Sequence, residues 1–148
     1  MESESLSSGG FLRLGNQLRS WMVCAEHERW ITAVRRFAPE MMAPLVPAIH
    51  AFQPSQVKAS LKTKPNLQAV LLWEVRQGSV LDACDNLAQI RIMARQVFCI
   101  LAVTELGERE KTVLAELGSA AMIRHPEELP ALAGMLKTYF NRSSQTKA

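Results

Sequence analysis

The stretch AVLLWEV, residues 69–75, decides the fold that this sequence predicts. Six of its seven residues are apolar, and they do not alternate with polar residues. A continuous apolar run of this length is typical of a parallel strand that is covered on both faces. The sequence therefore predicts a central buried strand here.

Four other short apolar runs recur along the chain. They are WMVCA (21–25), VPAIHAF (46–52), VFCILAV (97–103) and AAMIR (120–124). Pro47 has no amide hydrogen, so the second run is expected to lie at an edge of the sheet or to begin after the proline. Stretches with apolar residues at helical spacing follow the runs, as Trp30, Val34 and Phe37 show after the first.

Prolines and a serine mark the expected helix ends. Pro39 and Pro44 bracket the predicted end of the first helix, and Ser55 is a candidate cap for the second. Pro126 is placed to open the last helix, whose apolar stripe ends at Phe140.

Five strands that alternate with five helices predict an α/β fold. Parallel strands need crossover helices, and right-handed crossovers place helices on both faces, which gives a three-layer sandwich around a five-stranded parallel sheet. Ligands of such sheets bind beyond the carboxyl ends of the strands. Functional residues are therefore expected at 25–28, 73–78, 104–107 and 124–126.

The chain of 148 residues is long enough for one domain with its own core. We expect residues 1–18 to be a flexible tail and lead-in, 19–140 the folded domain, and 141–148 a polar C-terminal tail. The first ten residues lack the positive charge and apolar run of a signal peptide. Three cysteines, Cys24, Cys84 and Cys99, form neither an even set nor a CxxC pair, so a cytoplasmic protein is expected, with no membrane association.

The composition excludes several classes of function. A net charge of +3 with no basic run longer than Arg35-Arg36 argues against a nucleic-acid partner. No glycine lies between Gly15 and Gly78, so the first strand has no phosphate-binding loop, and no cofactor is expected.

Acidic residues are few at the predicted strand ends. The two aspartates, Asp82 and Asp85, fall in one predicted helix, which excludes mechanisms that need several aspartates on different strands. Glu26, Glu28 and Glu74 are weak candidates for a magnesium site because hard cations take oxygen ligands. The favoured alternative is no metal, with the first two glutamates at a solvated helix N-terminus.

The order of the strand-end residues resembles the receiver domain of bacterial two-component response regulators, a flavodoxin-like (βα)5 fold. The resemblance covers about residues 19–140 and is carried most by VFCILAVTELGEREKTVLAELGSAAMIRHPEELPALAGML, residues 97–136. It implies that Thr104 takes the position of the family's switch threonine. It also implies that Pro126 takes the position of the proline that follows a cis peptide bond.

The sequence departs from the family at the residues that carry its chemistry. Glu26 keeps one acid of the family's first pair, but Ala25 replaces the other. Trp73 stands at the position of the phosphoacceptor aspartate, and Glu74, one residue later, is expected to point the wrong way unless a bulge re-aims it. His125 replaces the family's lysine, and a neutral imidazole is a poor substitute for a permanent cation. The resemblance thus implies a degenerate pocket of Glu26, Trp73, Glu74, Thr104, His125 and Pro126.

We therefore expect a pseudo-receiver, meaning a receiver-like domain that is not phosphorylated. It would be a protein-interaction or signalling module rather than an enzyme, with a protein partner or a second copy of itself. By family analogy its contact face is formed by the fourth helix, fifth strand and fifth helix, unless this is an ordinary solvated surface. The exposed candidates are Glu108, Arg109, Lys111, Arg124 and Lys137.

Two alternatives stay open on the sequence alone. One is a residual magnesium-dependent receiver that uses Glu74 as phosphoacceptor, with Glu26, Glu28, Thr104 and His125 around it. The other is a flavodoxin-like domain that binds a small molecule, with Trp73 stacked on a planar ligand.

Overall fold

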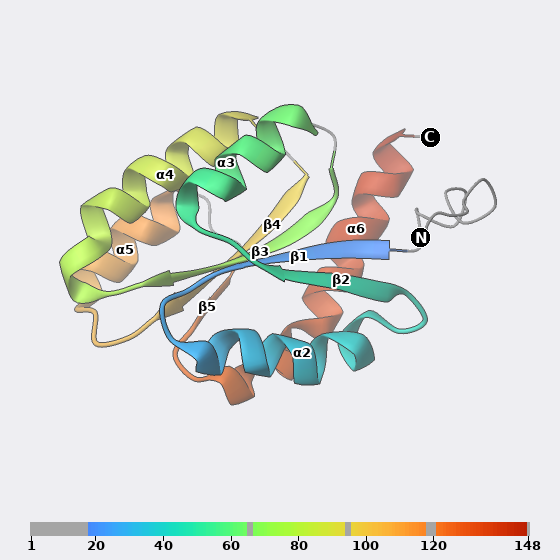
Figure 1. Cartoon of the computed structure of the whole chain (residues 1–148), viewed down its shortest axis with the longest axis horizontal. Coiled ribbons are helices and arrows are strands. Elements are labelled where there is room, and N and C mark those ends of the chain that lie inside the picture. Colours follow the sequence, from blue (N-terminus) through green and yellow to red (C-terminus); the bar gives the residue numbers. More distant parts are fainter. Residues whose placement is uncertain (1–17, 65–66, 94–95, 118–120, 148) are drawn as a thin grey trace.

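The computed structural model describes residues 18–64, 67–93, 96–117 and 121–147, and within them one parallel sheet forms the centre of the molecule (Figure 1). The strand order is β2-β1-β3-β4-β5, which is the flavodoxin-like order. The predicted α/β fold is thereby confirmed. The strands are β1 (Leu18–Cys24), β2 (Val46–Ala51), β3 (Ala69–Val75), β4 (Val97–Val103) and β5 (Ala121–Ile123).

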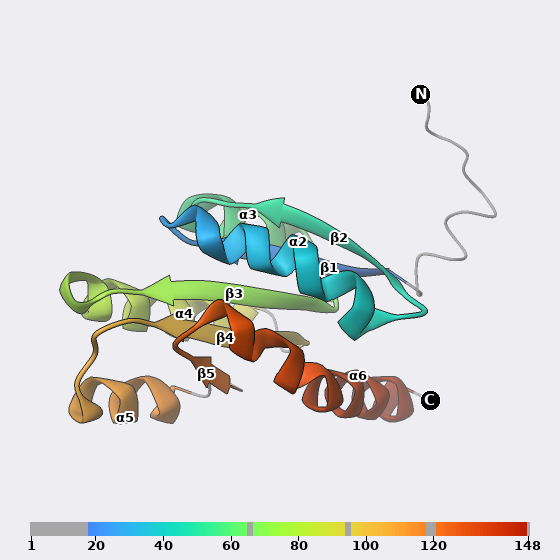
Figure 2. The same cartoon turned by 90° about the horizontal axis from the view of Figure 1, so that it is seen from below.

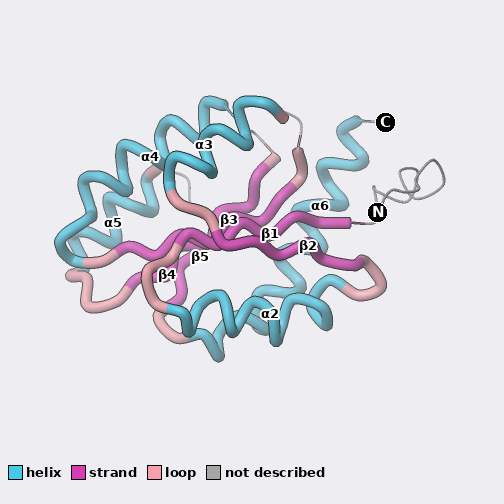
Figure 3. Tube along the Cα trace, in the orientation of Figure 1, coloured by secondary structure: helices cyan, strands magenta, loops and turns pink. Residues whose placement is uncertain are grey.

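Of the α-helices that the structure describes, two cover one face of the sheet and three cover the other, and Figures 2 and 3 show these layers. The first layer contains α2 (Glu28–Met42) and α6 (Ala133–Lys147). The second contains α3 (Pro54–Thr63), α4 (Val80–Met93) and α5 (Glu108–Glu116). Short 3₁₀ helices η2 (Gln77–Ser79) and η3 (Pro126–Leu132) precede α4 and α6. None of the described helices has the length and apolar character of a membrane span.

Strict alternation of side chains along β3 divides the core into two clusters. Val70 and Leu72 pack with α2 and α6, whereas Leu71 and Trp73 pack with α3, α4 and α5. The pairing of β3 with β1 and β4 runs in continuous register, without a bulge. Alternation therefore carries Glu74 to the α2 side of the sheet and Trp73 to the opposite side.

The ends of the strands and helices differ from several sequence predictions. Leu18, the last residue of the expected lead-in, belongs to β1, while residues 1–17 lie outside the described part of the chain. Helix α2, by contrast, ends at Met42, between Pro39 and Pro44 as predicted, and its last turn buries Met41 and Met42 in the core. Gln53, not Ser55, is the N-cap of α3, and its backbone N–H donates to Gln56 Oε1 at 2.7 Å.

The C-terminal segment also differs from its prediction. Residues 126–132 form a 3₁₀ helix, and Pro130 inside it would disrupt a regular α-helix. Helix α6 then runs to Lys147, so residues 141–147 are helical rather than a tail. The cis peptide bond of the described chain joins Ala43 and Pro44, and the expected one before Pro126 is not present.

Candidate functional site

Glu74 is the only buried charged residue in the part of the chain that the structure describes. Its side chain is 1% exposed and lies at the carboxyl end of β3, on the α2 side of the sheet. A charged carboxylate in such a position needs hydrogen-bond donors, because its desolvation is otherwise strongly unfavourable.

The N-terminal turn of α2 supplies these donors. The backbone N–H groups of Glu26 and His27 donate to Glu74 Oε1 at 2.7 and 3.2 Å. His27 Nδ1 and Trp30 Nε1 lie 2.5 and 3.2 Å from Glu74 Oε2, so each carboxylate oxygen has two donors. Amides at a helix N-terminus have no partner within the helix and attract negative charge. Glu74 therefore caps α2 from a distant strand.

Hydrogen bonding lowers the pKa of Glu74. Burial alone would raise the pKa of this carboxyl, but the donors from the His27 side chain and from the His27 and Glu26 backbones outweigh it. The net effect holds the pKa below its ordinary value, so Glu74 is ionised at neutral pH. His27 must then carry its proton on Nδ1 in order to donate to the carboxylate.

A polar cavity of about 670 Å³ lies outside this cluster, at the carboxyl ends of the strands. Arg76 Nη1 donates to Glu26 Oε1 at 2.6 Å, and Arg29 Nη2 reaches Thr104 Oγ1 at 3.4 Å. Two arginines thus engage the acid and the hydroxyl at this edge. The residues that line the cavity are Glu26, His27, Arg29, Arg76, Gln77, Gly78, Ser79, Thr104 and Glu105.

The residues of the predicted degenerate pocket do not all meet in this cavity. Glu26 and Thr104 line it, and Glu74 lies behind His27. Trp73 packs in the layer of α3, α4 and α5. The predicted orientations, with Trp73 at the acceptor position and Glu74 pointing away from the site, are therefore wrong. The paired register puts Leu71 and Trp73 on one face of β3 and Glu74 on the other, so Glu74 reaches the start of α2 without a bulge.

His125 and Pro126 lie outside the lining of the cavity, although the sequence analysis placed them in the pocket. His125 is exposed and precedes η3, where its backbone N–H donates to Glu128 Oε1 at 3.0 Å. The position expected to hold the pocket's cation therefore serves as a helix cap.

Two of the three glutamates named as weak metal candidates are engaged by other groups. Both oxygens of Glu74 accept hydrogen bonds from residues 26–30, and Glu26 is paired with Arg76. Across the described ranges, no group of three or more His, Cys, Asp or Glu side chains is placed to hold a metal ion.

The parts that His27 and Trp30 play were not predicted from the sequence. These residues are three apart at the start of α2, so both reach the same side of its first turn. Both carry ring N–H donors, and β3 contains one carboxylate in an otherwise apolar run. Two ring N–H donors three residues apart, together with a single acid in a buried strand, could have predicted this cluster.

Comparisons with known proteins identify the fold. No protein-family model matches the sequence, and a search of curated proteins gives no significant match. Solved structures do match. A CpaE2 protein from Sinorhizobium meliloti 1021 aligns with a TM-score of 0.64 and 15% identity, over 79% of this chain and 98% of that one. The pilus assembly protein CpaE from Caulobacter crescentus CB15 gives 0.64 and 11%, over 80% and 98%.

The third match is a CheY-like protein, TadZ, from Pseudomonas aeruginosa PAO1, with a TM-score of 0.62 and 10% identity over 80% of this chain and 92% of that one. The fold is that of a receiver-like domain. At these identities the likeness concerns the fold, and what the receiver-like domain does must be argued from its own residues.

Replacing Glu74 by Gln should destabilise the domain by about 2–4 kcal/mol, because the new amide group would face donors that need an acceptor. The matched control is Glu26→Gln, whose carboxylate is 73% exposed and whose loss should cost less than about 1 kcal/mol. Urea unfolding at pH 7 measures both. Equal stabilities of the two variants would contradict the assigned role of Glu74.

The stability that Glu74 confers should depend on pH with a defined sign. Its folded pKa lies below the unfolded value of about 4.3, so its contribution is complete above about pH 5 and is lost as pH falls through the folded pKa. The difference in unfolding free energy between wild type and Glu74→Gln should shrink as the pH is lowered from 7 to 3. A difference that stays constant over that range would show that the pKa of Glu74 is the same in the folded and unfolded states, and a difference that grows as the pH falls would show that Glu74 is protonated in the native state.

Proposed function

We propose that this receiver-like domain is a pseudo-receiver, which works in the cytoplasm by binding another protein and is not controlled by phosphorylation. The observation that carries the proposal is the engagement of Glu74. Its Oε1 accepts from the two residues that lead into α2 and its Oε2 from Trp30 of α2, and its side chain is almost completely shielded from solvent. The carboxylate serves to join α2 to β3 and is not free to react.

Phosphoryl transfer requires a nucleophile that can reach the phosphorus in line, together with cations that neutralise the developing charge. Glu74 is covered by the first turn of α2, and Glu26 forms an ion pair with Arg76. Asp82 and Asp85 lie in α4 rather than at a strand end. These positions disfavour a residual phosphoacceptor, and they support a non-enzymatic role.

The small-molecule alternative depended on Trp73, and its position disfavours that use. The indole is 5% exposed and packs with Leu71, Leu87 and Leu106 in the layer of α3, α4 and α5. A ring buried in this layer fills the core and does not present a face to a planar ligand.

The proposed contact face lies around β5, an edge strand with α5 on one side and α6 on the other (Figure 2). Apolar side chains are available on both helices, since Val113 is 42% exposed and Met135 49%. Charged groups surround them in both signs, which suits a protein partner or a second copy of the chain. They are the exposed residues Glu108, Arg109, Arg124 and Lys137, together with Lys111, which was predicted to be exposed but is half-buried and pairs with Glu108 at 3.3 Å.

Incubation with acetyl phosphate and Mg²⁺ should leave the intact mass of the protein unchanged, because Glu74 is held by hydrogen bonds and no group of acids among the described residues is placed to hold a metal ion. The matched comparison is the Glu74→Gln variant under the same conditions. A stable gain of one phosphoryl group in the wild type that the variant lacks would overturn the proposal and establish Glu74 as a phosphoacceptor.

Reversing two charges on the contact face should abolish binding without unfolding the domain. Arg124→Glu with Lys137→Glu is the test variant, and Lys62→Glu on exposed α3 is the matched control. Analytical ultracentrifugation measures self-association, and affinity capture with mass spectrometry measures partner binding. The control should keep whatever association the wild type shows, and the test variant should lose it. Retention by the test variant would exclude this face.

A further inference from the structure

Exposed apolar side chains gather where α4 and α5 lie side by side on one face of the sheet (Figure 1). Among the large apolar side chains that are exposed in the described part of the chain, Leu81 and Ile92 of α4 are the most exposed, at 81% and 82%. A cavity of about 440 Å³ lies beside Ile92, between α4 and the end of α5. Its lining is Ala88, Arg91, Ile92, Glu116 and Leu117. Such a surface is typical of a site that binds another protein.

The apolar residues of α4 form one stripe. Ala88 follows Leu81 by seven residues and precedes Ile92 by four, so all three lie on the same side of the helix, over about 16 Å of its length. Val113 of α5 precedes Leu117 by one helical turn and therefore lies on the side of α5 that borders the cavity. We call the surface formed by Leu81, Ala88, Ile92, Val113 and Leu117 the α4–α5 groove.

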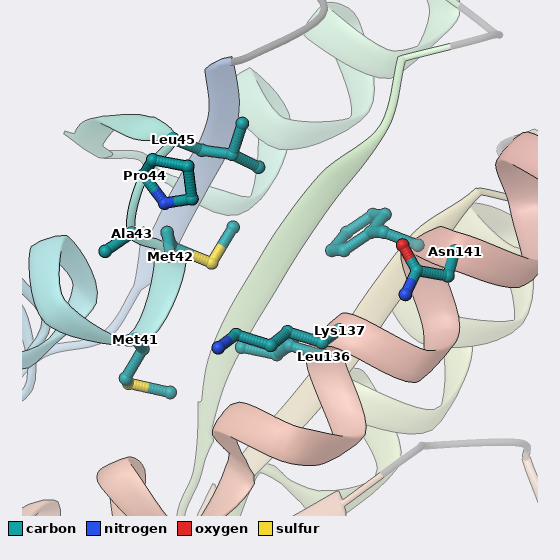
Figure 4. A pocket seen from close by; sticks show the side chains of 9 residues that line it. Met41, Met42, Ala43, Pro44, Leu45, Leu136, Lys137 and Asn141 are labelled. Carbon is teal, nitrogen blue, oxygen red and sulfur yellow. The ribbon is translucent and has the colours of Figure 1, made fainter.

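A cavity of about 460 Å³ between α2 and α6 is of a different kind (Figure 4). Four of its apolar lining residues are 5% exposed or less and belong to the core, namely Met41, Met42, Leu136 and Phe140. By contrast, Leu81 and Ile92 project from the surface of α4. A partner can therefore contact the α4–α5 groove while the core stays as it is.

Acidic residues border the α4–α5 groove. Asp85 is exposed and follows Leu81 by one helical turn, and Glu116 is exposed and lines the cavity. Neither forms an ion pair with a residue that the structure describes. Arg91 lies nearby, but its Nη1 donates to the carbonyl oxygen of Leu117 at 2.7 Å, so its charge is directed at the end of α5. The rim of the groove thus presents two unpaired carboxylates.

These charges distinguish between a second copy of the chain and another protein as the occupant. In a symmetric pair each chain presents the same surface to the other, so Asp85, near the middle of α4, would face its counterpart. Like charges placed opposite each other disfavour association. A partner with Lys or Arg beside an apolar stripe would instead complement both Asp85 and Glu116.

We propose that the α4–α5 groove binds a basic amphipathic helix of another protein. The apolar face of that helix would pack on Leu81 and Ile92, and its cationic side chains would lie beside Asp85 and Glu116. Apolar anchors at helical spacing in a groove are an established mode of peptide recognition. The stripe on α4 spans about three turns, so a partner helix of about twelve residues is long enough to cover it. Val113 also borders the proposed contact face around β5, but binding in the groove does not depend on the proposed function.

Fluorescence anisotropy with the full chain and a labelled peptide tests the proposal. The peptide has about 18 residues, with leucines along one helical face and lysines beside them, and in a matched peptide every lysine is replaced by glutamate. The lysine peptide should bind with a Kd of roughly 10–100 µM, as a small interface does. The glutamate peptide should bind at least about tenfold more weakly, because it would meet Asp85 and Glu116.

Two variants of the protein locate the binding site. Leu81→Ser/Ile92→Ser should weaken binding of the lysine peptide by about tenfold or more, because it removes both apolar anchors. The matched control is Val46→Ser on the edge strand β2, where a 64% exposed apolar side chain lies outside the groove. This control should bind as the wild type does. The replaced side chains are all exposed, so the melting temperatures should agree within about 2 °C.

A third variant, Asp85→Lys/Glu116→Lys, tests the part that charge plays. It replaces both carboxylates of the rim by ammonium groups, so it should bind the glutamate peptide more tightly than the lysine peptide. An unchanged preference for the lysine peptide would contradict the role assigned to these acids.

Three further results would overturn the proposal. The first is that the lysine peptide does not bind the wild type, and the second is that it binds the Leu81→Ser/Ile92→Ser variant equally well. The third is self-association of the wild type in analytical ultracentrifugation that this variant loses, which would show that a second copy occupies the groove. The Arg124→Glu/Lys137→Glu variant should bind the lysine peptide as the wild type does, so failure here is distinguishable from failure of the proposed function.

Discussion

The contact between the Glu74 carboxylate and the first turn of α2 is the interaction on which the carboxyl-end edge of the sheet depends. It ties the central strand to the helix that covers one face, and it satisfies backbone amides that would otherwise lack partners. The same carboxylate also binds the ring nitrogens of His27 and Trp30 and so fixes the positions of both rings. An acid at the end of the central strand thus has a structural role in a place where a parallel α/β sheet ordinarily binds a ligand.

Most of the fold could be predicted from the sequence because the apolar runs are continuous and regularly spaced. The predicted limits of β3 and β4 are those of the structure, since both strands are buried on two faces and their ends coincide with polar residues. Helix starts were harder to predict, since Gln53 rather than Ser55 is the N-cap of α3. Pro39 disfavours a helix locally, yet α2 ends between Pro39 and Pro44 as predicted, with Met41 and Met42 buried in the core.

The site was less predictable than the fold, because its geometry depends on which face of β3 each residue occupies. Aligning the run with a family pattern placed Trp73 at the functional position, whereas the paired register puts the Trp73 ring in the opposite layer. Likewise, Glu26, Thr104 and His125 all follow strands, yet only the first two line the cavity. Strand-end position alone does not determine which side chains converge.

The two edges of the sheet limit how another chain could attach to it. On one side, Pro47 removes a backbone donor from the edge strand β2. On the other, β5 is only three residues long and offers few backbone groups to an added strand. A proline in an edge strand and a very short edge strand both suppress edge-to-edge pairing and the aggregation that follows from it. Recognition of this domain would therefore rely on its side chains, and the sheet itself is poorly suited to extension by a foreign strand.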